Sequence, residues 1–65
     1  MIAGDDPELY TWLTNAHRWG GDFIKALAEA GLRADAFNYA LMRPLLLRMK
    51  EKYPAYLDER WTRDV

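Results

Sequence analysis

The chain has 65 residues, no cysteine, and nine basic against ten acidic residues, so its formal net charge is -1. This composition excludes disulfide bonds, and one histidine without a thiolate excludes a zinc finger. It also argues against a strongly basic nucleic-acid binder and a heavily acidic nucleic-acid mimic. Alanine and leucine occur nine times each, whereas only six residues are β-branched. Helices are therefore favoured over strands, and we predict one small all-α domain over residues 1–65.

A first helix is predicted from Asp6-Pro7 to Gly20-Gly21. The Asp6 side chain can cap free backbone N–H groups, and proline suits the first helical position because it lacks the N–H donor that is unused there. The glycines end the helix by allowing left-handed backbone angles. The apolar face follows helical spacing and consists of Leu9, Trp12, Leu13 and Ala16.

A second, shorter helix is predicted from Asp22, a plausible cap, to Gly31, which suits a helix stop. Leu32 would then fold back on Leu27, as is usual for a helix that ends at glycine. The predicted buried face is formed by Phe23, Ile24, Leu27 and Ala28.

A third helix is predicted to start near Asp35 and to run toward Lys52. Pro44 interrupts it, so the chain forms either one kinked helix or two helices that are split there. We favour one kinked helix, because the apolar stripe keeps its phase across the proline. That stripe consists of Leu41, Met42, Leu45, Leu46, Met49 and Tyr53.

The residue before Pro54 avoids helical angles, so the third helix should close at Tyr53. Residues 55–65 have a weak helical pattern and are predicted to form a short helix or helical turn, docked through Leu57 and Trp61. The predicted fold is thus a compact bundle of three main helices with a short C-terminal helical segment.

His17 is a candidate for acid–base chemistry, because histidine is the residue type whose ordinary charge change falls near neutral pH. Its neighbours at i-4 and i+4 are Leu13 and Gly21, so it has no carboxylate partner on its own helix. The chain has no serine or cysteine nucleophile for a triad. We therefore expect no enzymatic activity, no cofactor and no metal.

Residues 23–42 also allow a comparison with the helix-turn-helix. Recognition helices read bases with polar or basic residues on their first turns, where this chain offers only Asn38. The basic residues come late, at the end that complements the helix dipole, so we prefer a plain helical hairpin. DNA binding stays the alternative hypothesis, through Asn38, Arg33, Arg43, Arg48 and Lys52.

A protein partner is the leading hypothesis. Three Trp and four Tyr exceed what so small a core can bury, and interfaces are enriched in Trp, Tyr and Arg. Equally, the extra rings could enlarge a poor core. If the third helix continues through Pro44, then Arg43, Leu47 and Lys50 share an outward face. The predicted contact residues, for a protein partner or a homodimer, are Trp61, Tyr56, Leu47, Arg43 and Lys50.

The runs NYALMRPLLL (residues 38–47) and MKEKYP (residues 49–54) resemble small phage- and prophage-encoded proteins without an assigned activity. The resemblance covers about a quarter of the chain and carries over no catalytic residue. It implies a small phage-type protein that binds a host or defence protein and modulates or inhibits it, for instance in the manner of anti-CRISPR proteins. The N-terminus lacks the features of a secretory signal, and no run is long enough to span a membrane. A cytoplasmic protein of a bacterial host cell is therefore expected.

Overall fold

A computed structural model describes residues 6–58, of which 87% are helical, and it contains no strand within that range. The elements are α1 (Pro7–Trp19), α2 (Asp22–Arg33), α3 (Ala36–Lys52) and a short 3-10 helix, η2 (Pro54–Leu57). The prediction of a bundle of three helices with a short C-terminal helical segment is confirmed.

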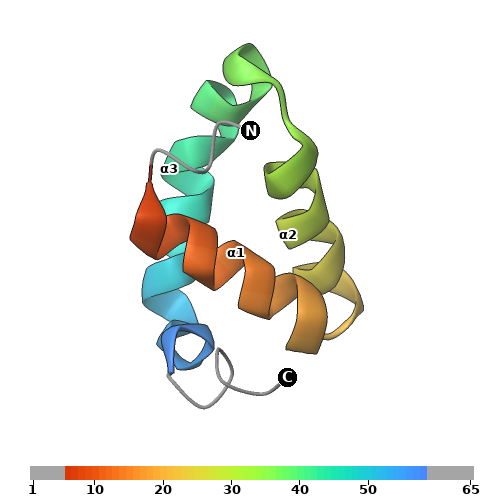
Figure 1. Ribbon diagram of the computed structural model, residues 1–65, viewed down its shortest axis with the longest axis vertical. Coiled ribbons are helices and arrows are strands. Elements are labelled where there is room, and N and C mark those ends of the chain that lie inside the picture. Colours follow the sequence, from red (N-terminus) through yellow and green to blue (C-terminus); the bar gives the residue numbers. More distant parts are fainter. Residues whose placement is uncertain (1–5, 59–65) are drawn as a thin grey trace.

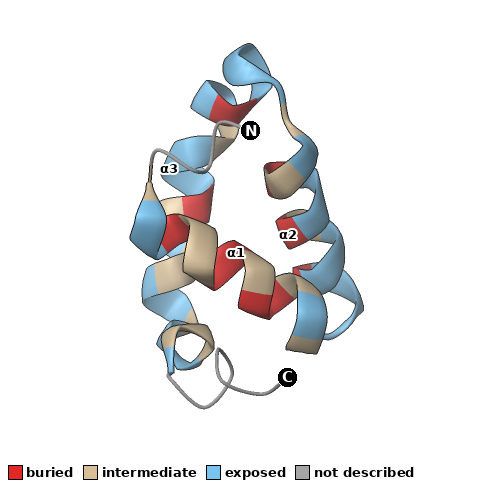
Figure 2. Ribbon diagram, in the orientation of Figure 1, coloured by how far each residue is buried: buried red, intermediate tan, exposed pale blue. Residues whose placement is uncertain are grey.

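Helix α1 is the centre of the molecule. In Figure 1, α2 and α3 both run along the long axis, and α1 crosses in front of them. The buried residues are concentrated on α1 and on the sides of α2 and α3 that face it (Figure 2). The core consists of Leu9, Trp12, Leu13, Ala16, Ile24, Ala28, Tyr39 and Leu46.

The turn between α1 and α2 is made by Gly20 and Gly21, as expected, but for a different reason. Neither glycine has a positive φ, so the predicted left-handed ending is wrong. Gly20 is needed because of space: a Cβ there would lie 2.5 Å from the Ala16 carbonyl oxygen and 2.7 Å from Cγ2 of Ile24. Close approach of the two helices therefore explains this glycine.

Helix α2 continues through Gly31 to Arg33, so the predicted stop at Gly31, with Leu32 folding back on Leu27, is wrong. Gly31 is buried instead, and a Cβ there would lie 3.0 Å from Cδ2 of Leu13 and 3.1 Å from Cδ1 of Leu46. It thus marks the point where side chains of α1 and α3 approach the α2 backbone.

Helix α3 begins with a side-chain cap, because the Asp35 carboxylate accepts a hydrogen bond of 2.8 Å from the Asn38 backbone N–H. The helix runs unbroken through Pro44, so the split alternative is wrong. Proline removes the N–H that would bond to the Ala40 carbonyl. Ala40 and Pro44 are both exposed, so water can donate a hydrogen bond to the Ala40 carbonyl oxygen.

The C-terminal helical segment is held by α1. The indole N–H of Trp12 donates to the Tyr53 carbonyl at 2.9 Å, and the Asn15 amide donates to the Tyr56 carbonyl at 2.7 Å. The Tyr56 ring meets Trp12 edge-on, with ring centroids 6.0 Å apart. Leu57 is half-buried against the core, as predicted. The predicted docking residue Trp61 lies outside the described residues.

Candidate interaction surface on the outer face of α3

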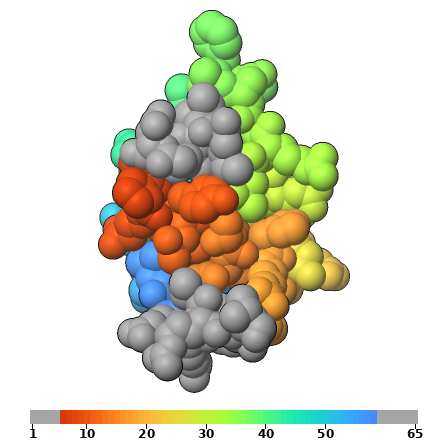
Figure 3. Space-filling view, viewed as in Figure 1, coloured from red at the N-terminus to blue at the C-terminus, as the bar shows by residue number. Residues whose placement is uncertain are grey.

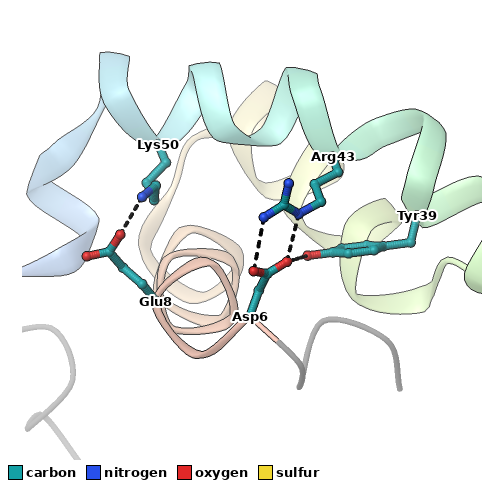
Figure 4. Close-up of polar contacts among 5 residues, drawn as sticks. All are labelled: Asp6, Glu8, Tyr39, Arg43 and Lys50. Atoms are coloured by element: carbon teal, nitrogen blue, oxygen red, sulfur yellow. Dashed lines mark hydrogen bonds and ion pairs between the residues drawn. The ribbon is translucent and has the colours of Figure 1, made fainter.

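Polar contacts at two acidic residues, Asp6 and Glu8, fix how α3 is rotated against α1 (Figure 4). Arg43 donates to both oxygens of Asp6, from Nε at 2.8 Å and from Nη2 at 3.2 Å, and the Tyr39 hydroxyl donates to the same carboxylate at 3.2 Å. About two helical turns after Arg43, Lys50 pairs with Glu8. Asp6 therefore does not cap α1 with its side chain, because that carboxylate is directed to α3.

The bidentate pair shifts the titration of both partners. The Arg43 guanidinium, chiefly through its hydrogen bond, holds the pKa of Asp6 below the ordinary aspartate value, against the opposing effect of desolvation. The Asp6 carboxylate in turn raises the pKa of Arg43. Such a pair favours the charged forms of both groups in the folded state.

We expect acid to weaken this contact. Because the Asp6 pKa is lower in the folded than in the unfolded chain, its contribution to stability is complete above about pH 5 and is lost as the pH falls through about 4 and below. Urea unfolding of Asp6→Asn should show a midpoint below that of the parent at pH 7, and the difference should shrink toward pH 2. Glu51→Gln is the control, since Glu51 is exposed and forms no ion pair within residues 6–58. A difference that does not change with pH would contradict the assignment.

The residues predicted to face outward on the third helix turn toward α1 instead. Leu47 is half-buried against the core, and the Lys50 side chain is only 19% exposed. Arg43, Leu47 and Lys50 thus do not form an outward face, because Asp6 and Glu8 of α1 pair with this side of α3. Tyr56 is half-buried at Trp12, and Trp61 lies outside the described residues. The binding role assigned to these residues stays a prediction.

The predicted nucleic-acid residues do not gather on one face. Asn38 bonds to the Asp35 carboxylate at 3.2 Å, Arg33 pairs with Glu29 at 3.6 Å on α2, and Arg43 is held by Asp6. Arg48 and Lys52 are exposed on the second half of α3. No cluster of basic side chains lies at the start of α3, where a recognition helix would need one.

Three large apolar side chains of α3 are exposed. Phe37 is 87%, Leu41 79% and Leu45 45% exposed, and they follow one another at intervals of four residues. Such spacing places them along one line of a helix, and we call these three residues the outer face of α3. Leu41 and Leu45 were expected in the buried stripe. The rest of that stripe is confirmed, because Leu46 is buried and Met42, Met49 and Tyr53 are half-buried against the core. Tyr39, which was not in the predicted stripe, is buried with them.

Phe23, which was expected on the buried face of the second helix, is exposed, whereas Trp12 is buried as predicted. Phe23 is 63% and Phe37 87% exposed, whereas Trp12 is completely buried and Tyr39 is 4% exposed. The indole N–H of Trp12 and the hydroxyl of Tyr39 each donate a hydrogen bond, and this makes burial of their large rings favourable. Figure 3 shows the start of α3, in green, projecting at the upper end of the molecule.

His17 has a carboxylate partner, but that partner lies on another helix. Its Nε2 lies 3.2 Å from Oε1 of Glu29 on α2, and both side chains are about half exposed. Only the packing of α1 on α2 brings these residues together. Within residues 6–58, no group of three or more metal-ligating side chains is found.

Comparison of the chain with protein-family models, with curated proteins and with solved structures finds no match. Within the part of the chain that the structure describes, none of the helices is both long and apolar enough to cross a lipid bilayer. The outer face of α3 therefore has to be interpreted from its own chemistry.

Proposed function

We propose that this chain is a non-enzymatic protein-binding module that contacts its partner through the outer face of α3. The observation that supports this proposal is the exposure of Phe37 and Leu41 on a helix whose opposite side is already in the core. A helix with apolar residues on opposite sides normally has both sides covered. Contiguous apolar surface is also more typical of an interaction site than of a monomer surface.

The spacing of the outer face suggests the shape of the partner's site. Phe37, Leu41 and Leu45 are anchors of the kind that a helix presents to an apolar groove. Phenylalanine and leucine provide no directional polar contact, so shape and apolar area would determine the affinity. The resemblance of residues 38–54 to phage-encoded proteins favours a host or defence protein as the partner and inhibition as the outcome.

Site-specific photo-crosslinking tests the proposal. A photoreactive phenylalanine analogue replaces Phe37 in one sample and Phe23 in another, and each protein is irradiated in a lysate of the cell in which the chain is naturally produced. Phe23 is the matched control, because it is also an exposed phenylalanine but lies on α2. We expect a heteromeric adduct from position 37 that mass spectrometry identifies and that position 23 does not give.

A second arm carries Leu41→Glu together with the analogue at position 37. Because a carboxylate in the middle of the outer face must be desolvated in the complex, the adduct should be lost. Equal adducts from positions 37 and 23, or an adduct that survives Leu41→Glu, would contradict the proposed surface. Circular dichroism confirms that each variant keeps its helices.

A further inference from the structure

The outer face of α3 has a pattern that can match itself. Phe37 and Leu45 lie four residues before and after Leu41. If two copies of α3 cross in opposite directions at Leu41, then Leu41 meets its own equivalent and each Phe37 meets the partner's Leu45. Such a two-fold contact is isologous, because the same patch serves both molecules and the assembly closes as a dimer.

Charges beyond this apolar patch favour the same antiparallel direction. Asp35 precedes Leu41 by six residues and Arg48 follows it by seven, and both are exposed. Arg48 forms no ion pair within residues 6–58. In an antiparallel pair, Arg48 of each copy approaches Asp35 of the other, whereas a parallel pair would place like charges together. Opposed helix dipoles also favour the antiparallel pair.

We infer that in the free protein the outer face is covered by a second copy of this chain, with the two α3 helices antiparallel and centred on Leu41. This inference rests on the proposed use of the outer face as a contact surface. A stable interface buries about 800 Å² on each partner. Even an aromatic side chain buries at most about 250 Å², so the three side chains of the outer face together supply less than about 800 Å². The dimer is therefore of micromolar rather than nanomolar affinity, and a heteromeric partner competes with it.

The test is the molar mass of the intact chain in solution, measured by sedimentation equilibrium from about 1 µM to 1 mM. The parent protein should pass from monomer to dimer within this range. Leu41→Glu should raise the dissociation constant more than about 30-fold, because it places two carboxylates against each other at the centre of the contact. Ala26→Glu is the matched control: it adds the same carboxylate at an exposed position of α2 and should leave the dissociation constant within about twofold.

Arg48→Ala tests the direction of the helices. It removes an attraction from the antiparallel pair, so the dissociation constant should rise about fivefold at low salt and less at high salt. In a parallel pair the same variant removes a repulsion and tightens the dimer, which would overturn the antiparallel arrangement, as would an unchanged constant.

Two outcomes separate this inference from the proposed function. A parent protein that stays monomeric up to about 1 mM overturns the inference. If position 37 still gives a heteromeric adduct in that case, the proposed function stands without it. A dimer that dissociates on Leu41→Glu, without any heteromeric adduct, supports the inference and removes the proposed function. A dimer that Leu41→Glu leaves intact overturns the inference, because another surface then forms it.

Discussion

Trp12→Ala is expected to remove a large share of the free energy of unfolding of this protein. Trp12 is completely buried in the core, and truncation of a buried tryptophan costs about 3–5 kcal/mol. A domain of this length has a free energy of unfolding of only about 3–10 kcal/mol. The ring also carries the indole N–H that bonds to the Tyr53 carbonyl and the edge-on contact with Tyr56. Far-UV circular dichroism during urea unfolding measures the effect.

Trp12→Phe separates the ring from its hydrogen bond. Phenylalanine keeps most of the apolar volume but leaves the Tyr53 carbonyl without its donor, so we expect a loss of about 1–3 kcal/mol and a folded protein. If Trp12→Ala costs less than about 1 kcal/mol, Trp12 is not the centre of the core. If the two variants lose equal stability, the hydrogen bond rather than the ring is decisive.

Gly20→Ala should destabilise the protein by about 1–3 kcal/mol, the usual cost of added atoms in a packed site. The new methyl group would lie 2.5 Å from the Ala16 carbonyl oxygen and 2.7 Å from Cγ2 of Ile24. That carbonyl also accepts the Gly20 backbone N–H at 2.8 Å, so relief of the overlap must disturb the end of α1. The end of α1 and the start of α2 would have to move apart.

Gly21→Ala is the matched control for this prediction. A Cβ at Gly21 has no neighbour within 4 Å, and its φ of -74° is as ordinary as the -73° of Gly20. Alanine there should be neutral or should stabilise the protein by up to about 1 kcal/mol, because it restricts the unfolded chain. Thermal unfolding of both variants measures the contrast. Equal effects of the two substitutions would show that backbone freedom, and not space at Gly20, explains the pair.

Local sequence signals located the helices well because each signal acts within one or two turns. Pro7 at the start of α1, Asp35 at the cap of α3 and Pro54 after its end lie where the sequence predicts them. The role of Gly31 was predicted wrongly for the same reason, since a local signal does not show what packs against it. A glycine that ends a helix and a glycine that admits a neighbouring helix look alike in sequence, and only the positions of Leu13 and Leu46 distinguish them.

The candidate surface was hidden by an ambiguity in α3. Leu41 and Leu45 continue an apolar stripe with Met42 and Leu46, so the periodicity of this helix allows more than one buried side. The charges that bear on it are present in the sequence, acidic at the start of α1 and basic along α3, but the sequence does not say which of them pair. Asp6 and Glu8 meet Arg43 and Lys50, as is seen only when the two helices are brought together.

The sequence by itself determined an all-α chain without disulfides and the approximate ends of its helices, and it raised the question of whether so many large side chains fit one small core. Composition and short-range capping suffice for that. Only the tertiary structure decided which of these side chains lie outside the core. The rings of Trp12 and Tyr39 are buried where α1 packs across the other helices, and each has a polar partner there: the Tyr53 carbonyl for Trp12 and the Asp6 carboxylate for Tyr39. Phe37 and Leu41 are left outside because α1 covers only one side of α3.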